Sequence, residues 1–318
     1  MSLRTKRLVT LCMTVAMMAP VMQSCFTGVD STPKITEREI KRQKVKVTPE
    51  QLFLSDIAAE APAQWKPGKK LYVTDNRIVL IFSTGIDGHT SDIPDSLGGS
   101  EITLTSVDYA TGLTGADEVQ FTFRDDAGNT LLYRPGLSRS TFVSDTSLTV
   151  PFTIDPDMVA AVDARMQGNT YYLLTPRRTA PDGSQHDGLR YVPVTIAAVR
   201  PGDSNYPLRV FFTEKASPDT LSVLMTAGNN RTSTRNFDKL FSFDNPRKNY
   251  PAITDEVWEM IQHSRVRTGM TPDECRLALG APTEYLRYPG VASVIERWTY
   301  GDGVYLFFED GVLTRFRR

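Results

Sequence analysis

The sequence has little cysteine and little histidine, with three residues of each type among 318. Cys12 lies inside an apolar run near the N-terminus, Cys25 follows that run, and Cys275 stands far from both. This usage leaves no internal disulfide framework and excludes a cystine-stapled fold. Cys275 falls in a predicted helix beside Leu277 and Leu279, so we expect a packed and unreactive thiol.

The motifs of metal sites and of nucleophilic catalysis are also absent from the sequence. His89, His186 and His263 show no His-x-x-x-His spacing, and there is no cysteine pair, no EF-hand loop and no Gly-x-Ser-x-Gly. We therefore predict a protein that is not an enzyme and that binds no metal and no cofactor. Two alternatives stay open: carboxylates that only the fold brings together, and a metal or substrate contact by His89 and His186 in corresponding loops.

A membrane-spanning run and a strong charge of one sign are missing too. The longest apolar run, from Leu8 to Met22, has about 15 residues, whereas a helix that spans a bilayer needs about 20. There are 36 lysines and arginines against 37 aspartates and glutamates. The global charge therefore implies neither nucleic acid nor a bulk anionic surface as the partner.

The N-terminal segment has the order of a secretory signal, because three basic residues precede the apolar run. The segment Met22–Cys25 resembles the lipobox of bacterial lipoproteins, in which the cysteine is acylated and becomes the mature N-terminus. We predict a signal peptide over 1–24, lipid on Cys25, and a polar, basic tether over 25–47. Phe26 after the cysteine, by resemblance to known sorting signals, favours the outer membrane with the protein facing the periplasm.

The rest of the chain is predicted to be α+β and predominantly β. Thr48 followed by Pro49 and Gln51 predicts a capped helix that extends to about Glu60. Alternating apolar residues then predict strands, which fall at 70–73, 77–82, 101–107, 118–123 and 130–133.

Part of this pattern occurs twice. Gly68–Thr74 and Arg77 recur as Gly168–Thr175 and Arg178, and two further strand pairs recur in kind, at 102–107 with 194–199 and at 119–123 with 208–212. A second helix is expected from Asp155 to about Met166. We predict two tandem antiparallel β-modules, 48–150 and 151–250, each led by a short helix and built as a small barrel or sandwich.

The last segment, 251–318, is predicted to contain two helices followed by an antiparallel meander. Thr254 caps the first helix, and Thr271 with Glu274 forms a capping box for the second, which ends at Gly280. Strands follow at 285–288, 294–300, 304–308 and 312–316, separated by glycine-rich turns.

This segment resembles the BamE family, also called small protein A. The residues that carry the resemblance are Gly269, Met270, Thr271, Glu274, Leu279, Gly280, Pro282, Trp298, Tyr300, Phe308 and Gly311. Their roles are expected to be in folding. The resemblance implies an outer-membrane lipoprotein that supports the machinery for β-barrel protein assembly by binding other lipoproteins and lipid headgroups.

The expected function is therefore that of a non-catalytic, protein-binding envelope lipoprotein. Tyr285, Tyr288, Phe316 and Arg317 are candidates for an aromatic and basic contact patch on the last domain; the alternative is that Tyr288 and Phe316 fill the core. Two other functions are kept open. One is binding and inhibition of another periplasmic protein, and the other is glycan binding or processing through the loops 85–99 and 180–188.

Overall fold

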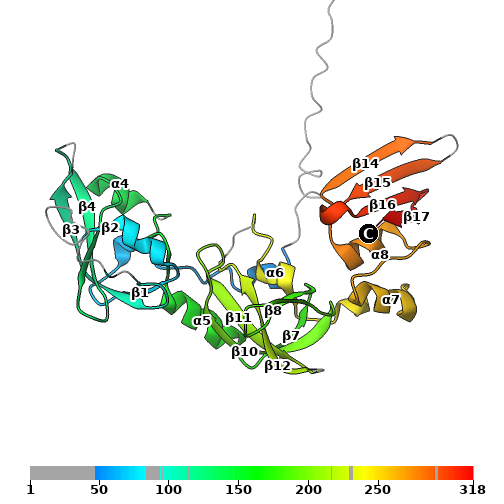
Figure 1. Ribbon diagram of the computed structural model, residues 1–318, viewed down its shortest axis with the longest axis horizontal. Coiled ribbons are helices and arrows are strands. Elements are labelled where there is room, and N and C mark those ends of the chain that lie inside the picture. The colour runs from blue at the N-terminus through cyan, green and yellow to red at the C-terminus, as the bar shows by residue number, and fades with distance from the viewer. Residues whose placement is uncertain are drawn as a thin grey trace, which may run out of the picture. The chain divides into compact units, whose positions relative to one another are not determined.

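The computed structural model describes residues 47–83, 94, 96–112, 115–145, 147–215, 217–228, 232–290 and 293–317. The predicted signal peptide, Cys25, nearly all of the predicted tether, His89 and most of the loop 85–99 lie outside these residues. The described chain is mainly β-structure with short helices, and its strands form three antiparallel sheets (Figure 1). None of the described helices has the length and apolar character needed to cross a membrane.

The first sheet has six strands in the order β2-β5-β4-β3-β1-β6. Its core side carries the buried residues of the first apolar cluster, among them Phe121 and Phe123 of β4. The strands are β1 Lys70–Val73, β2 Phe82–Ser83, β3 Glu101–Thr111, β4 Asp117–Arg124, β5 Thr130–Tyr133 and β6 Thr153–Ile154. Associated helices are the 3-10 turns η1 Pro62–Gln64 and η2 Asn76–Ile81 and the α-helix α4 Arg139–Ser144.

The second sheet has seven strands in the order β13-β7-β10-β11-β12-β8-β9. Helix α5 (Pro156–Met166) packs against it through Met158, Val159, Val162 and Met166, all buried in the second apolar cluster. The strands are β7 Thr170–Leu173, β8 Arg177–Thr179, β9 Gln185–Asp187, β10 Val192–Pro201, β11 Leu208–Glu214, β12 Ser217–Met225 and β13 Phe241–Ser242. Helix α6 Phe237–Leu240 precedes β13, and the 3-10 turn η3 Pro246–Asn249 follows it.

Five strands of the first sheet have counterparts in the second, in the orders β5-β4-β3-β1-β6 and β12-β11-β10-β7-β13. The β3/β4 register shifts between Leu104 and Ser106, and the β10/β11 register shifts between Ile196 and Ala198. The backbone N–H of Gly68 donates to Leu104 O at 2.8 Å, and that of Gly168 donates to Ile196 O at 2.9 Å. The sequence recurrence therefore coincides with a recurrence of strand pairing, bulge and turn.

The third sheet is a four-stranded meander, β14-β15-β16-β17, preceded by helices α7 and α8 (Figure 1). The helices are α7 Asp255–Gln262 and α8 Pro272–Leu279, and the strands are β14 Glu284–Pro289, β15 Val294–Thr299, β16 Tyr305–Glu309 and β17 Val312–Arg317. A 3-10 turn, η4 Gly301–Gly303, joins β15 to β16. The Asp310-Gly311 turn between β16 and β17 has positive φ at both residues, 48° and 77°, which is the backbone that a two-residue hairpin turn requires.

Two sequence expectations differ from the structure. Residues 77–82 are expected as a strand, but 77–81 belong to η2 and only Phe82 lies in a strand. Asp75 caps η2 by accepting a hydrogen bond from Arg77 N at 2.8 Å. The supposed counterparts Arg77 and Arg178 also differ, because Arg77 is exposed whereas Arg178 is buried at 2% exposure.

The helix expected over 48–60 is shorter than predicted, and its segment packs against a different sheet. The α-helical part is α3, Pro49–Leu52, with the predicted Thr48 capping box. The turns that follow it place Leu54 and Ile57 in the second apolar cluster. The rings of Phe53 and Phe237 pack together with their centroids 4.6 Å apart. The turns after this helix therefore pack against the second sheet, so the helix does not lead the first sheet.

Candidate binding surfaces of the C-terminal region

The family-motif residues around the start of α8 form its N-terminal cap. The backbone N–H of Thr271 donates to Glu274 Oε2 at 2.7 Å, and that of Glu274 donates to Thr271 Oγ1 at 3.3 Å. Just before the cap, Gly269 has φ of +92° and its N–H donates to Leu313 O at 2.8 Å, while Leu313 N–H donates to Met270 O at 2.8 Å. These residues fasten the entry of α8 to strand β17.

The remaining motif residues join the end of α8 to the sheet. Trp298 and Phe308 are fully buried with ring centroids 4.6 Å apart. The Tyr300 hydroxyl donates to the carbonyl of Gly280 at 3.1 Å, where the chain leaves α8 with φ of +87°. Leu279 and Pro282, before and after this point, are half-buried. These residues therefore pack in the interior or join α8 to the sheet.

The four residues predicted as one contact patch lie on two faces of the sheet. Neighbouring strands pair Tyr285 with Trp298, Trp298 with Leu306, and Leu306 with Phe316, so these residues form one row across the sheet. Tyr285 and Phe316 therefore share the face that packs on the helices. Tyr288 and Arg317 belong to the opposite face, because neighbouring positions along a strand alternate. The prediction of a single patch is therefore wrong.

The face opposite the helices, here called the outer face, carries an apolar strip. Leu286 and Tyr288 of the edge strand β14 are 40% and 43% exposed, and neither belongs to an apolar core. Ile295 of β15 and Phe307 of β16 are half-buried beside them and share their face, since Ile295 pairs with Tyr288 and Phe307 lies in the row of Leu286. The same face carries Arg297, which lies between Leu286 and Phe307 in their row, and Arg315 and Arg317 on the last strand.

One of these arginines is bound to the strip itself. The guanidinium of Arg315 lies over the Phe307 ring at 4.4 Å from its centroid. Arg297 is 3.6 Å from Glu284 at the start of β14. The outer face therefore combines aromatic and aliphatic side chains with arginine, which is the composition of interface cores.

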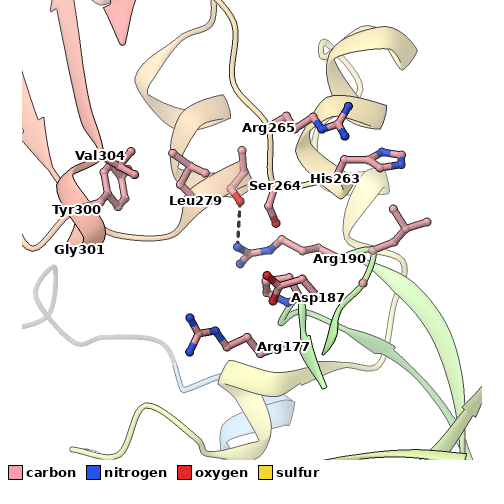
Figure 2. Close-up of a pocket in the computed structure, with 14 residues that line it drawn as sticks. Arg177, Asp187, Arg190, His263, Ser264, Arg265, Leu279, Tyr300, Gly301 and Val304 are labelled. Carbon is pink, nitrogen blue, oxygen red and sulfur yellow. Dashed lines mark hydrogen bonds between the residues drawn. The ribbon is translucent and has the colours of Figure 1, made fainter. Parts of the chain in front are cut away.

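A cavity of about 640 Å³ lies between the β8–β9 hairpin and the ends of α7 and α8 (Figure 2). Two neighbouring residues hold these elements together: Arg190 Nη1 donates to Ala278 O at 3.1 Å, and the Tyr191 hydroxyl donates to Leu277 O at 2.8 Å. The residues that line the cavity are Pro176, Arg177, Asp187, Gly188, Leu189, Arg190, His263, Ser264, Arg265, Ala278, Leu279, Tyr300, Gly301 and Val304.

Sequence reasoning missed this cavity and the buried arginine next to it. Arg178 Nε forms an ion pair with Glu214, and its other nitrogens donate to the carbonyls of Pro176 and Leu189. The segment expected as the loop 180–188 is mostly a β-hairpin, in which Ala180 N–H donates to Ser184 O at 2.9 Å. The available signal was the pair Arg177-Arg178 a few residues after the apolar strand β7.

Burial raises the pKa of two side chains near this region. Burial raises the pKa of the Cys275 thiol to about 12, with Glu274 adding to the effect. Burial also raises the pKa of Tyr300 well above its usual value. His263 is exposed and its Nδ1 lies 2.8 Å from Glu259 O, while His186 contacts the Ser184 hydroxyl at 2.9 Å. Across the described ranges, no group of three metal-ligating side chains occurs.

Comparison with known proteins adds no relative. No protein-family model matches the chain. No curated protein and no solved structure shows significant similarity to it.

Proposed function

We propose that this chain is a non-catalytic lipoprotein of the bacterial envelope that binds other proteins, and that its partners belong to the outer-membrane β-barrel assembly machinery. The observation that carries the binding role is the outer face of β14–β17. It exposes Leu286 and Tyr288 on an edge strand, beside arginines that suit a partner with an apolar patch and an acidic rim.

Membrane attachment enters the proposal through Cys25. The lipobox-like segment before it and the basic tether after it support a lipid anchor. Replacing Cys25 with serine is expected to move the protein from the membrane fraction to the soluble periplasmic fraction. Retention of the Cys25→Ser protein in the membrane fraction would show that lipid on Cys25 is not the anchor.

The proposed architecture is two tandem β-modules followed by a domain like that of the BamE family. The recurrence of strand order, bulge and glycine turn in the first two sheets supports an internal duplication. The Thr271 capping box and the Trp298–Phe308 contact support the family resemblance. In this architecture the last domain makes the principal contact.

The experiment compares two serine variants of the full chain. The change Leu286→Ser with Tyr288→Ser removes the exposed apolar side chains of the outer face, whereas Leu80→Ser changes an apolar residue that is 80% exposed on η2. After crosslinking in cells, barrel-assembly components should be recovered with the unaltered chain and with Leu80→Ser, and lost with the double variant. If such components are never recovered, the proposed link to barrel assembly is wrong.

A further inference from the structure

The cavity between the β8–β9 hairpin and the helix ends contains charges that the fold leaves unpaired. Within the described part of the chain, Arg177, Arg190 and Arg265 form no ion pair, and neither does the cavity carboxylate, Asp187. The lining thus carries three guanidinium groups and one carboxylate, which gives it a net positive charge. A cleft with a net positive lining attracts small anions more strongly than a flat surface does.

Two of these arginines are directed into the same part of the cavity. Figure 2 shows the guanidinium groups of Arg190 and Arg177 extending toward the side that carries Tyr300 and Leu279, whereas the Arg265 side chain points away. Arg265 therefore contributes at the rim, and Arg190 and Arg177 are the groups positioned to contact a ligand.

Arg190 is held in place by contacts on several sides. Its backbone N–H donates to Gln262 O at 2.9 Å, its Nη1 donates to Ala278 O at 3.1 Å, and its guanidinium lies 5.4 Å from the Tyr191 ring centroid. A guanidinium fixed in this way loses little freedom when it binds an oxyanion. Arg177 is exposed, and the structure gives its side chain no hydrogen-bond partner among the described residues.

The wall opposite the arginines is apolar. It is formed by Leu279, Val304 and the ring of Tyr300. A guanidinium pair facing an apolar wall fits a ligand with two parts, an oxyanion and an apolar body.

We infer that this cavity binds a small ligand in which a carboxylate or phosphate is attached to an apolar group. Arg190 and Arg177 hold the oxyanion, and Leu279, Val304 and Tyr300 contact the apolar group. Asp187 lies opposite Arg177 on the paired strand and limits the affinity by repelling the anion. This site is separate from the outer face, so its failure leaves the proposed protein-binding role untouched.

The test is calorimetric titration of the purified full chain with phenyl phosphate, benzoate and a short-chain anionic phospholipid below its micelle concentration. Arg177→Gln should weaken binding about tenfold, because hydrogen bonds to charged groups are among the stronger ones. Asp187→Asn should strengthen binding severalfold by removing the repulsion. These opposite signs separate a ligand contact from general damage to the cavity.

The matched control is Arg124→Gln, which removes an exposed arginine from β4 in the first sheet. It should leave binding unchanged. Binding of the aromatic probes assigns the site to a soluble anion, and binding of the phospholipid alone assigns the same chemistry to a lipid headgroup. The inference is overturned if no probe binds, if Arg177→Gln and Arg124→Gln act alike, or if Asp187→Asn weakens binding.

Discussion

Replacing Lys69 should destabilise the chain where β1 meets α5, because its ammonium group neutralises a buried carboxylate. Lys69 Nζ lies 2.8 Å from Asp155 Oδ1 and 2.6 Å from Asp157 Oδ2. The Lys69 and Asp155 side chains are 8% and 4% exposed, whereas that of Asp157 is 81% exposed. Lys69→Met therefore strands the charge of Asp155 in the interior while Asp157 can hydrate.

The size of the stability loss depends on the hydrogen bonds that Asp155 retains in the variant. Breaking a buried ion pair by removing one partner costs about 3–5 kcal/mol. Asp155 still accepts hydrogen bonds from the backbone N–H groups of Asp157 at 3.0 Å and Glu60 at 3.2 Å, so the lower end of this range applies. We expect a loss of about 3 kcal/mol for Lys69→Met. Adding Asp155→Asn, which keeps a side-chain acceptor for the helix cap, should restore most of it.

The assay is hydrogen exchange followed by mass spectrometry on peptides from β1 and α5, where about 3 kcal/mol corresponds to a change in protection of at least about a hundredfold. Lys70→Met is the control, since Lys70 pairs with Glu101 at the surface and its loss should change protection little. The reasoning is refuted if Lys69→Met behaves like Lys70→Met, or if the double variant is as unstable as Lys69→Met alone.

The pH dependence of this contribution has a defined sign. Burial alone lowers the pKa of Lys69, but its hydrogen bonds to Asp155 and Asp157 outweigh burial and leave the pKa raised above 10.5. A group whose pKa is higher in the folded state stabilises the fold below its unfolded pKa and loses that effect as the pH rises through the folded value. The effect of Lys69→Met should therefore be constant from pH 7 to pH 9 and diminish only above about pH 10.5.

Two further predictions concern the apolar cluster of the C-terminal region, which contains Cys275 and Trp298. The Cys275 thiol, buried and with its pKa raised to about 12, should not react with a thiol-specific disulfide reagent at pH 8 until the protein is unfolded, and rapid reaction in the native state would contradict the packing described. Trp298→Ala should destabilise the protein by about 3–5 kcal/mol in urea unfolding followed by the fluorescence of the remaining tryptophans, Trp65 and Trp258. Trp298→Phe should lower the free energy of unfolding clearly less than Trp298→Ala does, because the indole Nε1 is buried without an acceptor in the described structure. An equal loss of stability in both variants would show that this N–H is hydrogen-bonded.

The strands and caps could be predicted from sequence because their signals are local. β1 and β5 have the predicted bounds, and the predicted caps at Thr254 and Thr271 both accept hydrogen bonds from the first turn of their helices. The run 78–82 is continuously apolar and therefore favoured a strand, yet Ile78 is buried and Leu80 is 80% exposed. The Asp75 cap was the local signal that favoured a helical turn there.

Features that depend on residues far apart in the chain could not be predicted from such local signals. Nothing near Phe53 indicates that its ring meets Phe237, and nothing near Arg190 indicates that it reaches the end of α8. The division of Tyr285 and Tyr288 between two faces follows from strand alternation once β14 is known. Which face is covered depends on where α7 and α8 pack, and this is a tertiary property.

The central claim is that the outer face of β14–β17 contacts a partner in the envelope. A photoreactive phenylalanine derivative replacing Tyr288 in cells tests it directly, with the same residue replacing Leu80 as the reference position. The account predicts a discrete crosslinked product at position 288 that contains a barrel-assembly component and is absent at position 80. Identical products at both positions, or no product at position 288, would contradict the account.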